Sequence, residues 1–245
     1  MTTETIYFDD DRKVSLTSYI LDSSEEMKTY KKRPAILIFP GGAYKFCSDR
    51  EAEPIAMAFL AEGYNAFILR YSLNENSAFP KPLEDAERAL NLLRENAEKY
   101  HIHKDKIAVI GFSAGGHLAA ALGTMGKIRP DAMILGYPCI LDSIGHILAS
   151  PIPSLEKEVD AKTPPCYIFS TYEDQLVPIE NSLEFASALN KNKIPFELHI
   201  FTNCGHGLSL AKSHTANGRS ESVNRTFSTW LPMCVDWLGG ILNID

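Results

Sequence analysis

Ser113 is the residue whose neighbours most clearly suggest chemistry, because it lies in the pattern Gly111-Phe112-Ser113-Ala114-Gly115. A short apolar run, Ile107–Ile110, precedes the pattern, and a stretch rich in alanine and leucine follows it. This order predicts a buried strand, a tight turn and a helix. A serine on so tight a turn needs small neighbours, and glycine costs least there. The pattern alone occurs by chance in many loops, but in this setting it predicts an exposed, nucleophilic hydroxyl.

A serine hydroxyl is a weak nucleophile at neutral pH, so it needs a base that removes its proton. His206 is the best placed of the seven histidines, since it follows the last predicted strand and has a glycine on each side, which lets the loop bend inward. His117 follows Ser113 by one helical turn, a spacing typical of a packed or capping residue. The other histidines are His146 and His214, in predicted loops and still open as alternatives, His101 and His103, before the serine's strand, and His199, within a strand.

A catalytic histidine needs a carboxylate that fixes its tautomer and stabilises the imidazolium formed during the reaction. Two acids, Glu173 and Asp174, come where the predicted strand Cys166–Tyr172 ends. Acids of this kind are mostly ordinary surface residues. We choose Asp174 as the partner of His206 and keep Asp142 in reserve.

Negative charge develops on the carbonyl oxygen when an ester is attacked, and hydrogen-bond donors must already be aimed at it. The backbone N–H of Ala114, directly after the serine, is one predicted donor. A second donor is expected from Pro40-Gly41-Gly42-Ala43-Tyr44, which follows the buried run Ala35–Phe39. Its small residues leave backbone amides open to a ligand, although a Gly-Gly pair alone would be no more than a turn.

The elements that must position these residues alternate along the chain. A β-hairpin is predicted over Thr5–Leu21, turning at Asp9-Asp10-Asp11. Strands are predicted at Ala35–Phe39, Asn65–Tyr71, Ile107–Ile110, Asp131–Tyr137, Cys166–Tyr172 and Phe196–Phe201, and helices at Ser48–Glu62, Pro82–Tyr100, after Ser113, at Ile179–Asn190 and at Arg225–Leu242. Such alternation predicts an α/β fold with a mostly parallel twisted sheet and helices on both faces. Ligands of such sheets lie beyond the carboxyl ends of the strands.

The length of 245 residues is typical of one α/β domain, so we expect residues 1–245 to form a single unit. The proline-rich region 138–165 is predicted to be a loop with at most a short helix, too short for a large lipase lid. The polar run Ser213–Asn224 is predicted to be a solvated loop.

Composition excludes several function classes. A net charge of −7 argues against a nucleic-acid partner, because no basic face is available. Apolar runs of four or five residues are far too short for a membrane span, and without a visible secretory signal we expect a cytoplasmic protein. No cofactor or metal is expected, since the five cysteines are odd in number and widely spaced. Composition does not decide whether the chain forms a homo-oligomer. The cysteines are Cys47, Cys139, Cys166, Cys204 and Cys234.

Four segments, IFPGGAY, GFSAGGHLAA, EDQLVP and CGHGLSL, together resemble the esterase/lipase branch of the α/β-hydrolase superfamily, especially small acetyl esterases and xylan-esterase-like proteins. The resemblance covers nearly all of the chain from Ala35 onward, and the chain order serine, acid, histidine is that of the superfamily. It implies Ser113 as nucleophile, Asp174 as acid and His206 as base. It further implies the amides of Gly42, Ala43 and Ala114 as an oxyanion hole. Tyr44, Leu176 and Val177, which adjoin these motifs, are expected to contact the substrate.

Two motifs depart from the family pattern. The common His-Gly-Gly-Gly reads Pro40-Gly41-Gly42-Ala43 here, so the support of a histidine is missing and alanine tolerates fewer backbone angles than glycine. The acid loop reads Tyr-Glu-Asp where many relatives have a glycine. Glu173 and Asp174 therefore stay alternatives for the acid.

The sequence predicts a serine carboxylesterase that removes short acyl groups, with acetyl expected, from sugars or other small hydroxylated molecules. One alternative is a peptidase or amidase on the same scaffold. Another is a protein that keeps the fold but uses the pocket only to bind a ligand.

Overall fold

The computed structural model describes the chain except residues 10–12, 28–30 and 245. The described residues form one sheet of eight strands in the order β1-β2-β4-β3-β5-β6-β7-β8. The strands are β1 (Thr2–Tyr7), β2 (Ser15–Ile20), β3 (Arg33–Phe39), β4 (Asn65–Arg70), β5 (Ile102–Phe112), β6 (Ala132–Gly136), β7 (Cys166–Thr171) and β8 (Phe196–Phe201). β1 and β2 are antiparallel and β2 is antiparallel to β4, whereas all pairs from β4 to β8 are parallel.

The predicted N-terminal hairpin and mostly parallel sheet are therefore confirmed. The expected turn residues Asp10 and Asp11 lie outside the described residues.

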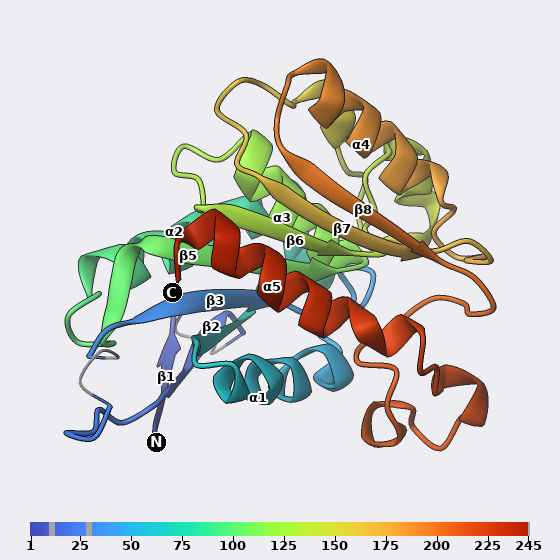
Figure 1. The fold of residues 1–245 in the computed structure, drawn as a ribbon. Coiled ribbons are helices and arrows are strands. Elements are labelled where there is room, and N and C mark those ends of the chain that lie inside the picture. The colour runs from blue at the N-terminus through green and yellow to red at the C-terminus, as the bar shows by residue number, and fades with distance from the viewer. Residues whose placement is uncertain (10–12, 28–30, 245) are drawn as a thin grey trace.

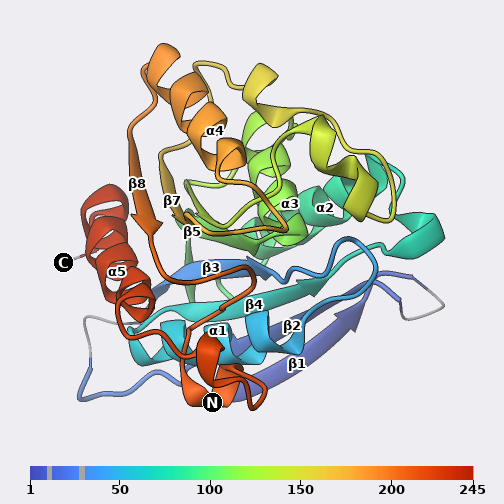
Figure 2. The same ribbon diagram turned by 90° about the vertical axis from the view of Figure 1, so that its right-hand side faces the viewer.

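Helices cover both faces of the sheet, as predicted (Figures 1 and 2). α1 (Glu53–Ala61) and α5 (Trp230–Leu242) enclose one apolar cluster, while α2 (Lys81–Glu95), α3 (Ala114–Thr124) and α4 (Glu180–Lys191) enclose the other. Strand β3 lies between the clusters, and all of its residues are buried. Its even-numbered residues Ile36 and Ile38 belong to the first cluster and its odd-numbered residues Leu37 and Phe39 to the second, as the two-residue period of a strand requires.

Several boundaries differ from the predictions. β5 begins at Ile102 rather than Ile107, because Ile102 pairs with Arg33 across a register shift. α1 begins at Glu53, with Pro54 in its first turn, and the preceding Asp49–Glu51 forms a separate 3₁₀ turn. α2 ends at Glu95, and α5 begins at Trp230 after a 3₁₀ turn at Phe227–Thr229.

The connection from β6 to β7 holds two 3₁₀ turns, Asp142–Ile147 and Leu155–Lys157, in line with the predicted loop. The run Ser213–Asn224 likewise contains only the 3₁₀ turns Ser213–Thr215 and Ser220–Ser222. No helix among the described residues is long and apolar enough to cross a membrane.

Candidate active site

Ser113 lies on a sharp turn between β5 and α3, with φ 53° and ψ −117°. A non-glycine residue in such a conformation costs on the order of 1–3 kcal/mol. The glycines two positions away are required by close approach: a Cβ on Gly111 would lie 2.0 Å from the Gly115 carbonyl oxygen, and one on Gly115 would lie 2.0 Å from the Phe39 carbonyl oxygen. The turn is held by the Ser113 N–H, which donates to the Gly136 carbonyl at 2.9 Å.

One hydrogen-bonded chain joins Ser113, His206 and Asp174. The Ser113 Oγ lies 2.9 Å from His206 Nε2, and His206 Nδ1 lies 2.6 Å from Asp174 Oδ2. An ionised carboxylate can only accept, so Nδ1 carries the hydrogen and Nε2 is left to accept from the serine hydroxyl. The Asp174 side chain is 1% exposed and that of His206 15%. The three residues follow β5, β7 and β8, so the carboxyl ends of three parallel strands bring them together.

The acid loop distinguishes the candidate acids. Asp174 Oδ1 accepts the backbone N–H groups of Leu176 and Val177, both at 2.9 Å, so the carboxylate is fixed from behind. Glu173 is exposed and makes no contact with His206. Asp142 is exposed and lies 3.8 Å from Lys157 Nζ. The geometry therefore joins Asp174 to the histidine.

His117 and His146 make other contacts, and His214 lines a separate cavity. His117 is fully buried: its Nδ1 accepts from the Tyr44 hydroxyl at 2.9 Å and its Nε2 donates to the Pro153 carbonyl at 3.2 Å. The exposed His146 bonds through Nδ1 to the Ser143 carbonyl. Burial lowers the pKa of His117 to about 4, so it stays neutral as a packed residue.

The backbone amides that we predict to form an oxyanion hole lie in two places. Ala114 begins α3, so its N–H has no acceptor within the helix and lies at the positive end of the helix dipole. The loop after β3 turns through Gly42 (φ 133°), Ala43 (φ 58°) and Tyr44 (φ 58°). Among the described residues, the amides of Gly42, Ala43 and Ala114 donate to no protein group. Three donors are thus left open beside the serine.

The loop after β3 reaches Ser113 because Gly41 has no side chain. A Cβ on Gly41 would lie 3.1 Å from the Ser113 Cβ and 2.6 Å from a Glu51 carboxylate oxygen. One on Gly42 would lie 2.1 Å from the Phe46 carbonyl oxygen. Ala43 adopts the positive φ that favours glycine, so the departure from the family pattern is accommodated as local backbone strain.

Two of the three residues expected to contact the substrate, Tyr44 and Val177, have buried side chains. The Tyr44 ring is buried against Tyr71 and His117, and the Val177 side chain is buried as well. Leu176 alone presents its side chain to solvent. Neither Tyr44 nor Val177 therefore lines an open surface, because the positive φ of Tyr44 turns its ring into the core while Val177 holds Asp174 through its backbone.

A buried polar network that the sequence analysis did not predict links two loops. One is the loop after β3, Pro40–Tyr44, called the oxyanion loop below, and the other is the loop after β8 that carries His206 and Ser209, called the histidine loop. Glu51 is buried; its Oε2 accepts the Gly41 N–H at 2.9 Å and its Oε1 accepts the Tyr137 hydroxyl at 2.6 Å. The same hydroxyl accepts the Ser209 N–H at 2.9 Å. The ring of Tyr137 meets the His206 ring edge-on at 4.9 Å. Burial raises the pKa of Tyr137 well above its usual value, so the hydroxyl keeps its proton.

Arg50, the neighbour of Glu51, holds the histidine loop from another side. Its Nη1 donates to the carbonyls of Gly207 at 2.8 Å and Thr215 at 3.3 Å, and its own carbonyl accepts from the Ser209 hydroxyl. In the sequence Glu51 stands in a charged run, Asp49-Arg50-Glu51, and Tyr137 at the end of a predicted strand. Neither belongs to a motif.

The cysteines lie apart from the Ser113–His206–Asp174 chain or remain protonated beside it. All five thiols are free, and the described residues contain no group of three or more His, Cys, Asp or Glu that could hold a metal ion. The Cys139 Sγ lies 4.0 Å from Ser113 Oγ, but burial raises its pKa to about 12. Burial also raises the pKa of Cys204 to about 11. Both therefore stay protonated near neutral pH.

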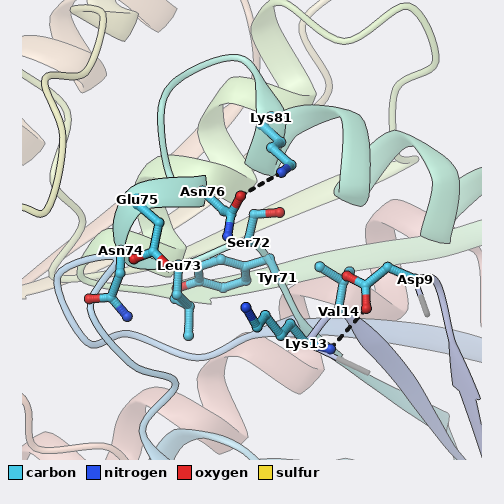
Figure 3. A pocket seen from close by; sticks show the side chains of 10 residues that line it. All are labelled: Asp9, Lys13, Val14, Tyr71, Ser72, Leu73, Asn74, Glu75, Asn76 and Lys81. Atoms are coloured by element: carbon cyan, nitrogen blue, oxygen red, sulfur yellow. Dashed lines mark hydrogen bonds between the residues drawn. The ribbon is translucent and has the colours of Figure 1, made fainter. Parts of the chain in front are cut away.

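A cavity of about 550 Å³ lies at the carboxyl end of β4, between the hairpin and residues 71–81 (Figure 3). Lys81 Nζ bonds to Asn76 Oδ1 across it at 2.8 Å. Its inner wall is Tyr71, whose hydroxyl donates to the Pro40 carbonyl. None of the candidate catalytic residues lines it, since β3 separates it from β5.

Two protein families match different parts of the chain. The BD-FAE family matches residues 21–133, which hold the oxyanion loop and Ser113. The prolyl oligopeptidase family matches residues 145–228, which hold Asp174 and His206.

Similar proteins include enzymes named for xylan. The chain is 40% identical to endo-1,4-beta-xylanase B of Butyrivibrio fibrisolvens, over 77% of this chain and 34% of that protein. It is 30% identical to an acetylxylan esterase of Xylanibacter ruminicola, over 72% of this chain and 41% of that protein. The chain thus spans less than half the length of these two relatives. Among solved structures, MGS-M1, an α/β-hydrolase enzyme from a Medee basin deep-sea metagenome library, matches at 48% identity over 100% of this chain and 99% of that one, with a TM-score of 0.95.

Proposed function

The chain belongs to the α/β-hydrolase superfamily, and from this premise we propose that it is a serine carboxylesterase that works through an acyl-enzyme on Ser113. The observation that carries the proposal is the continuous hydrogen-bonded chain from Ser113 Oγ through His206 to Asp174. It provides a nucleophile, a base and an acid in the required order.

In the proposed reaction His206 Nε2 takes the proton of Ser113 as Oγ attacks the ester carbonyl. The negative charge on the carbonyl oxygen is stabilised by the amides of Ala114, Ala43 and Gly42. His206 then gives its proton to the departing alcohol. Water, deprotonated by His206, attacks the acyl-enzyme, and the acid is released as Ser113 regains its proton. Asp174 keeps Nδ1 protonated and stabilises the imidazolium throughout.

We further propose short acyl groups, acetyl above all, on sugars as the substrates. The names of the two xylan-related relatives support the sugar part. The segment between β6 and β7 supports the acyl part, because it is fastened against the oxyanion loop. The Ala149 N–H donates to the Ala43 carbonyl at 2.9 Å, and Lys45 Nζ donates to the Ile147 carbonyl at 3.0 Å. This fastening limits the room for a long chain on that side.

A series of p-nitrophenyl esters from acetate to octanoate tests the proposal. We expect the acetate to turn over fastest and Ser113→Ala to abolish turnover, whereas the matched variant Ser143→Ala, at an exposed serine, keeps it. Faster turnover of the octanoate would contradict the short-acyl proposal. Covalent labelling of Ser113 by a fluorophosphonate is expected, and its absence would favour a protein that only binds ligands.

The match of residues 145–228 to the prolyl oligopeptidase family is the specific observation in favour of a peptidase or amidase. Acetyl p-nitroanilides measured beside the matching p-nitrophenyl esters decide between the two. We expect esters alone to be cleaved at a measurable rate. Comparable cleavage of the anilides would favour the peptidase reading.

A further inference from the structure

A second cavity, of about 350 Å³, lies between the segment that follows the oxyanion loop and the loop that follows the histidine. We refer to it below as the Phe46 cavity. Its lining residues come from these two segments alone: Phe46, Cys47, Ser48, Asp49, Arg50, His214 and Asn217.

The lining of the Phe46 cavity is connected to the loops of the reacting centre on two sides. Phe46 packs on Gly42, since a Cβ on that glycine would lie 2.1 Å from the Phe46 carbonyl oxygen and 3.1 Å from its ring. On the other side Arg50 bonds to the carbonyl of Gly207 at 2.8 Å, and Gly207 directly follows His206. Two of the lining residues, Phe46 and Arg50, therefore contact residues that directly neighbour the predicted oxyanion amide of Ala43 and the base His206.

The chemistry of the lining suits an uncharged, polyhydroxylated ring. The Phe46 side chain is 58% exposed, although it costs free energy to leave an aromatic face in water. The same cavity is lined by Asp49, His214 and Asn217, whose side chains carry a carboxylate, an imidazole and an amide. A sugar ring can place its C–H face on the aromatic ring while its hydroxyls bond to such groups.

The charges of the lining oppose an anionic ligand. Asp49 pairs with Arg70 at 3.0 Å, and the Arg50 guanidinium is directed to the carbonyls of Gly207 and Thr215. The cavity therefore offers a carboxylate and neutral donors but no unengaged guanidinium for a phosphate. Binding there must come from stacking and from hydrogen bonds to hydroxyls.

We propose that the Phe46 cavity binds the sugar ring of the ester's alcohol half, with Phe46 as the stacking platform. This inference rests on the proposed function, because the acyl carbon must reach Ser113. Two larger cavities are less suitably placed to bind the alcohol half of an ester that reacts at Ser113. That of Figure 3 lies beyond β3, and one of about 420 Å³ is lined by Tyr172 and Asp174, at the end of the hydrogen-bonded chain farthest from the serine hydroxyl.

Phe46→Ala tests the inference through selectivity. For the purified protein we compare kcat/KM for an acetylated methyl β-xyloside with kcat/KM for ethyl acetate, whose alcohol has no ring. We expect the ratio to fall about tenfold in Phe46→Ala, as loss of one stacking contact worth about 1.4 kcal/mol would give, and chiefly through KM. Phe46→Trp should restore it.

Tyr172→Ala is the matched control, since this tyrosine is 64% exposed in the cavity behind Asp174. An unchanged ratio in Phe46→Ala, or a fall in Tyr172→Ala instead, overturns the inference. Circular dichroism melting at the wild-type temperature shows that Phe46→Ala is folded. Titration with methyl β-xyloside provides a second measurement. The Kd of the double variant Ser113→Ala/Phe46→Ala must be about tenfold higher than that of Ser113→Ala. Failure of the wild type to cleave ethyl acetate or to be labelled would count against the proposed function and not against this site.

Discussion

Asp174 owes its place beside His206 to its own backbone turn. Its Oδ1 is held by the N–H groups of Leu176 and Val177, so Oδ2 is left to face the imidazole. Glu173 points into solvent instead. The sequence could place an acid at the end of β7 but could not choose between two neighbours, because the choice depends on which carboxylate closes that turn.

Asp174→Asn tests the assignment of Asp174 as the acid, because it replaces one carboxylate oxygen by an amide nitrogen. An amide can donate to Nδ1 and stabilise the tautomer that cannot accept the serine proton, so we expect kcat for p-nitrophenyl acetate to fall by roughly a thousand- to ten-thousandfold. Glu173→Gln is the matched control and should stay within about twofold. A large loss in Glu173→Gln with little loss in Asp174→Asn would reverse the assignment.

The segment between β3 and α1, residues 40–52, combines two tasks in thirteen residues. Gly42 and Ala43 present open amides beside Ser113. Arg50 bonds to Gly207 and Ser209, and Glu51 is linked to Ser209 through the Tyr137 hydroxyl. The 3₁₀ turn at Asp49–Glu51 replaces the first turn of the predicted helix. It is this turn that directs the Glu51 carboxylate inward.

Glu51→Ala removes the acceptor of both the Gly41 N–H and the Tyr137 hydroxyl. Leaving such buried donors unpaired costs about 1–3 kcal/mol each, so we expect a lower melting temperature and a kcat reduced by roughly ten- to a hundredfold. Glu51→Gln keeps one acceptor oxygen and should recover part of both. Circular dichroism melting and p-nitrophenyl acetate kinetics measure the two effects. Wild-type kcat in Glu51→Ala would show that the network only stabilises the fold.

Local patterns predicted the fold and the three-residue chain because strands, the serine turn and the glycine-flanked histidine each carry their signal within a few positions. Partnerships across the sequence were not predictable in this way. Glu51 and Tyr137 are 86 residues apart, and neither lies in a motif. The packing of Tyr44 was not predictable for a related reason: its motif suggests a substrate contact, whereas its ring packs against Tyr71 and His117, far away in the sequence.

The molecule as a whole keeps one neutral imidazole in its core. His117 lies on α3 and connects the oxyanion loop, through Tyr44, with the long segment between β6 and β7, through Pro153. The Nε2–H tautomer uses both ring nitrogens, and a second proton would place a charge in the apolar core. Burial accordingly lowers the pKa of His117 to about 4.

The stability of the whole fold should therefore depend on pH through His117. An unfolded histidine takes up its proton near pH 6.5, whereas the folded one does so near pH 4, so protons favour the unfolded chain between these values. The contribution is complete above about pH 6.5 and is lost as the pH falls towards 4, on the order of 3 kcal/mol in all.

Urea unfolding of the wild type and of His117→Gln at pH 7 and pH 4.5 measures this contribution. The variant should lose about 2 kcal/mol less than the wild type on acidification, and His146→Gln, at an exposed histidine, should behave as the wild type. An identical pH dependence in His117→Gln would contradict the assignment. The His117 ring proton in NMR spectra gives an independent reading, since its shift should move only near pH 4.

The Tyr137 hydroxyl forms one hydrogen bond with Glu51 and another with Ser209. These two bonds constrain the design of chimeras between this protein and its homologues. When a crossover lies between residues 51 and 209, at least one of Glu51, Tyr137 and Ser209 comes from a different parent than the others. These three residues must nevertheless form the same two hydrogen bonds. If the two parents differ at any of these three positions, we expect the chimera to fold but to have a lower kcat. Transferring all three residues from one parent should restore kcat.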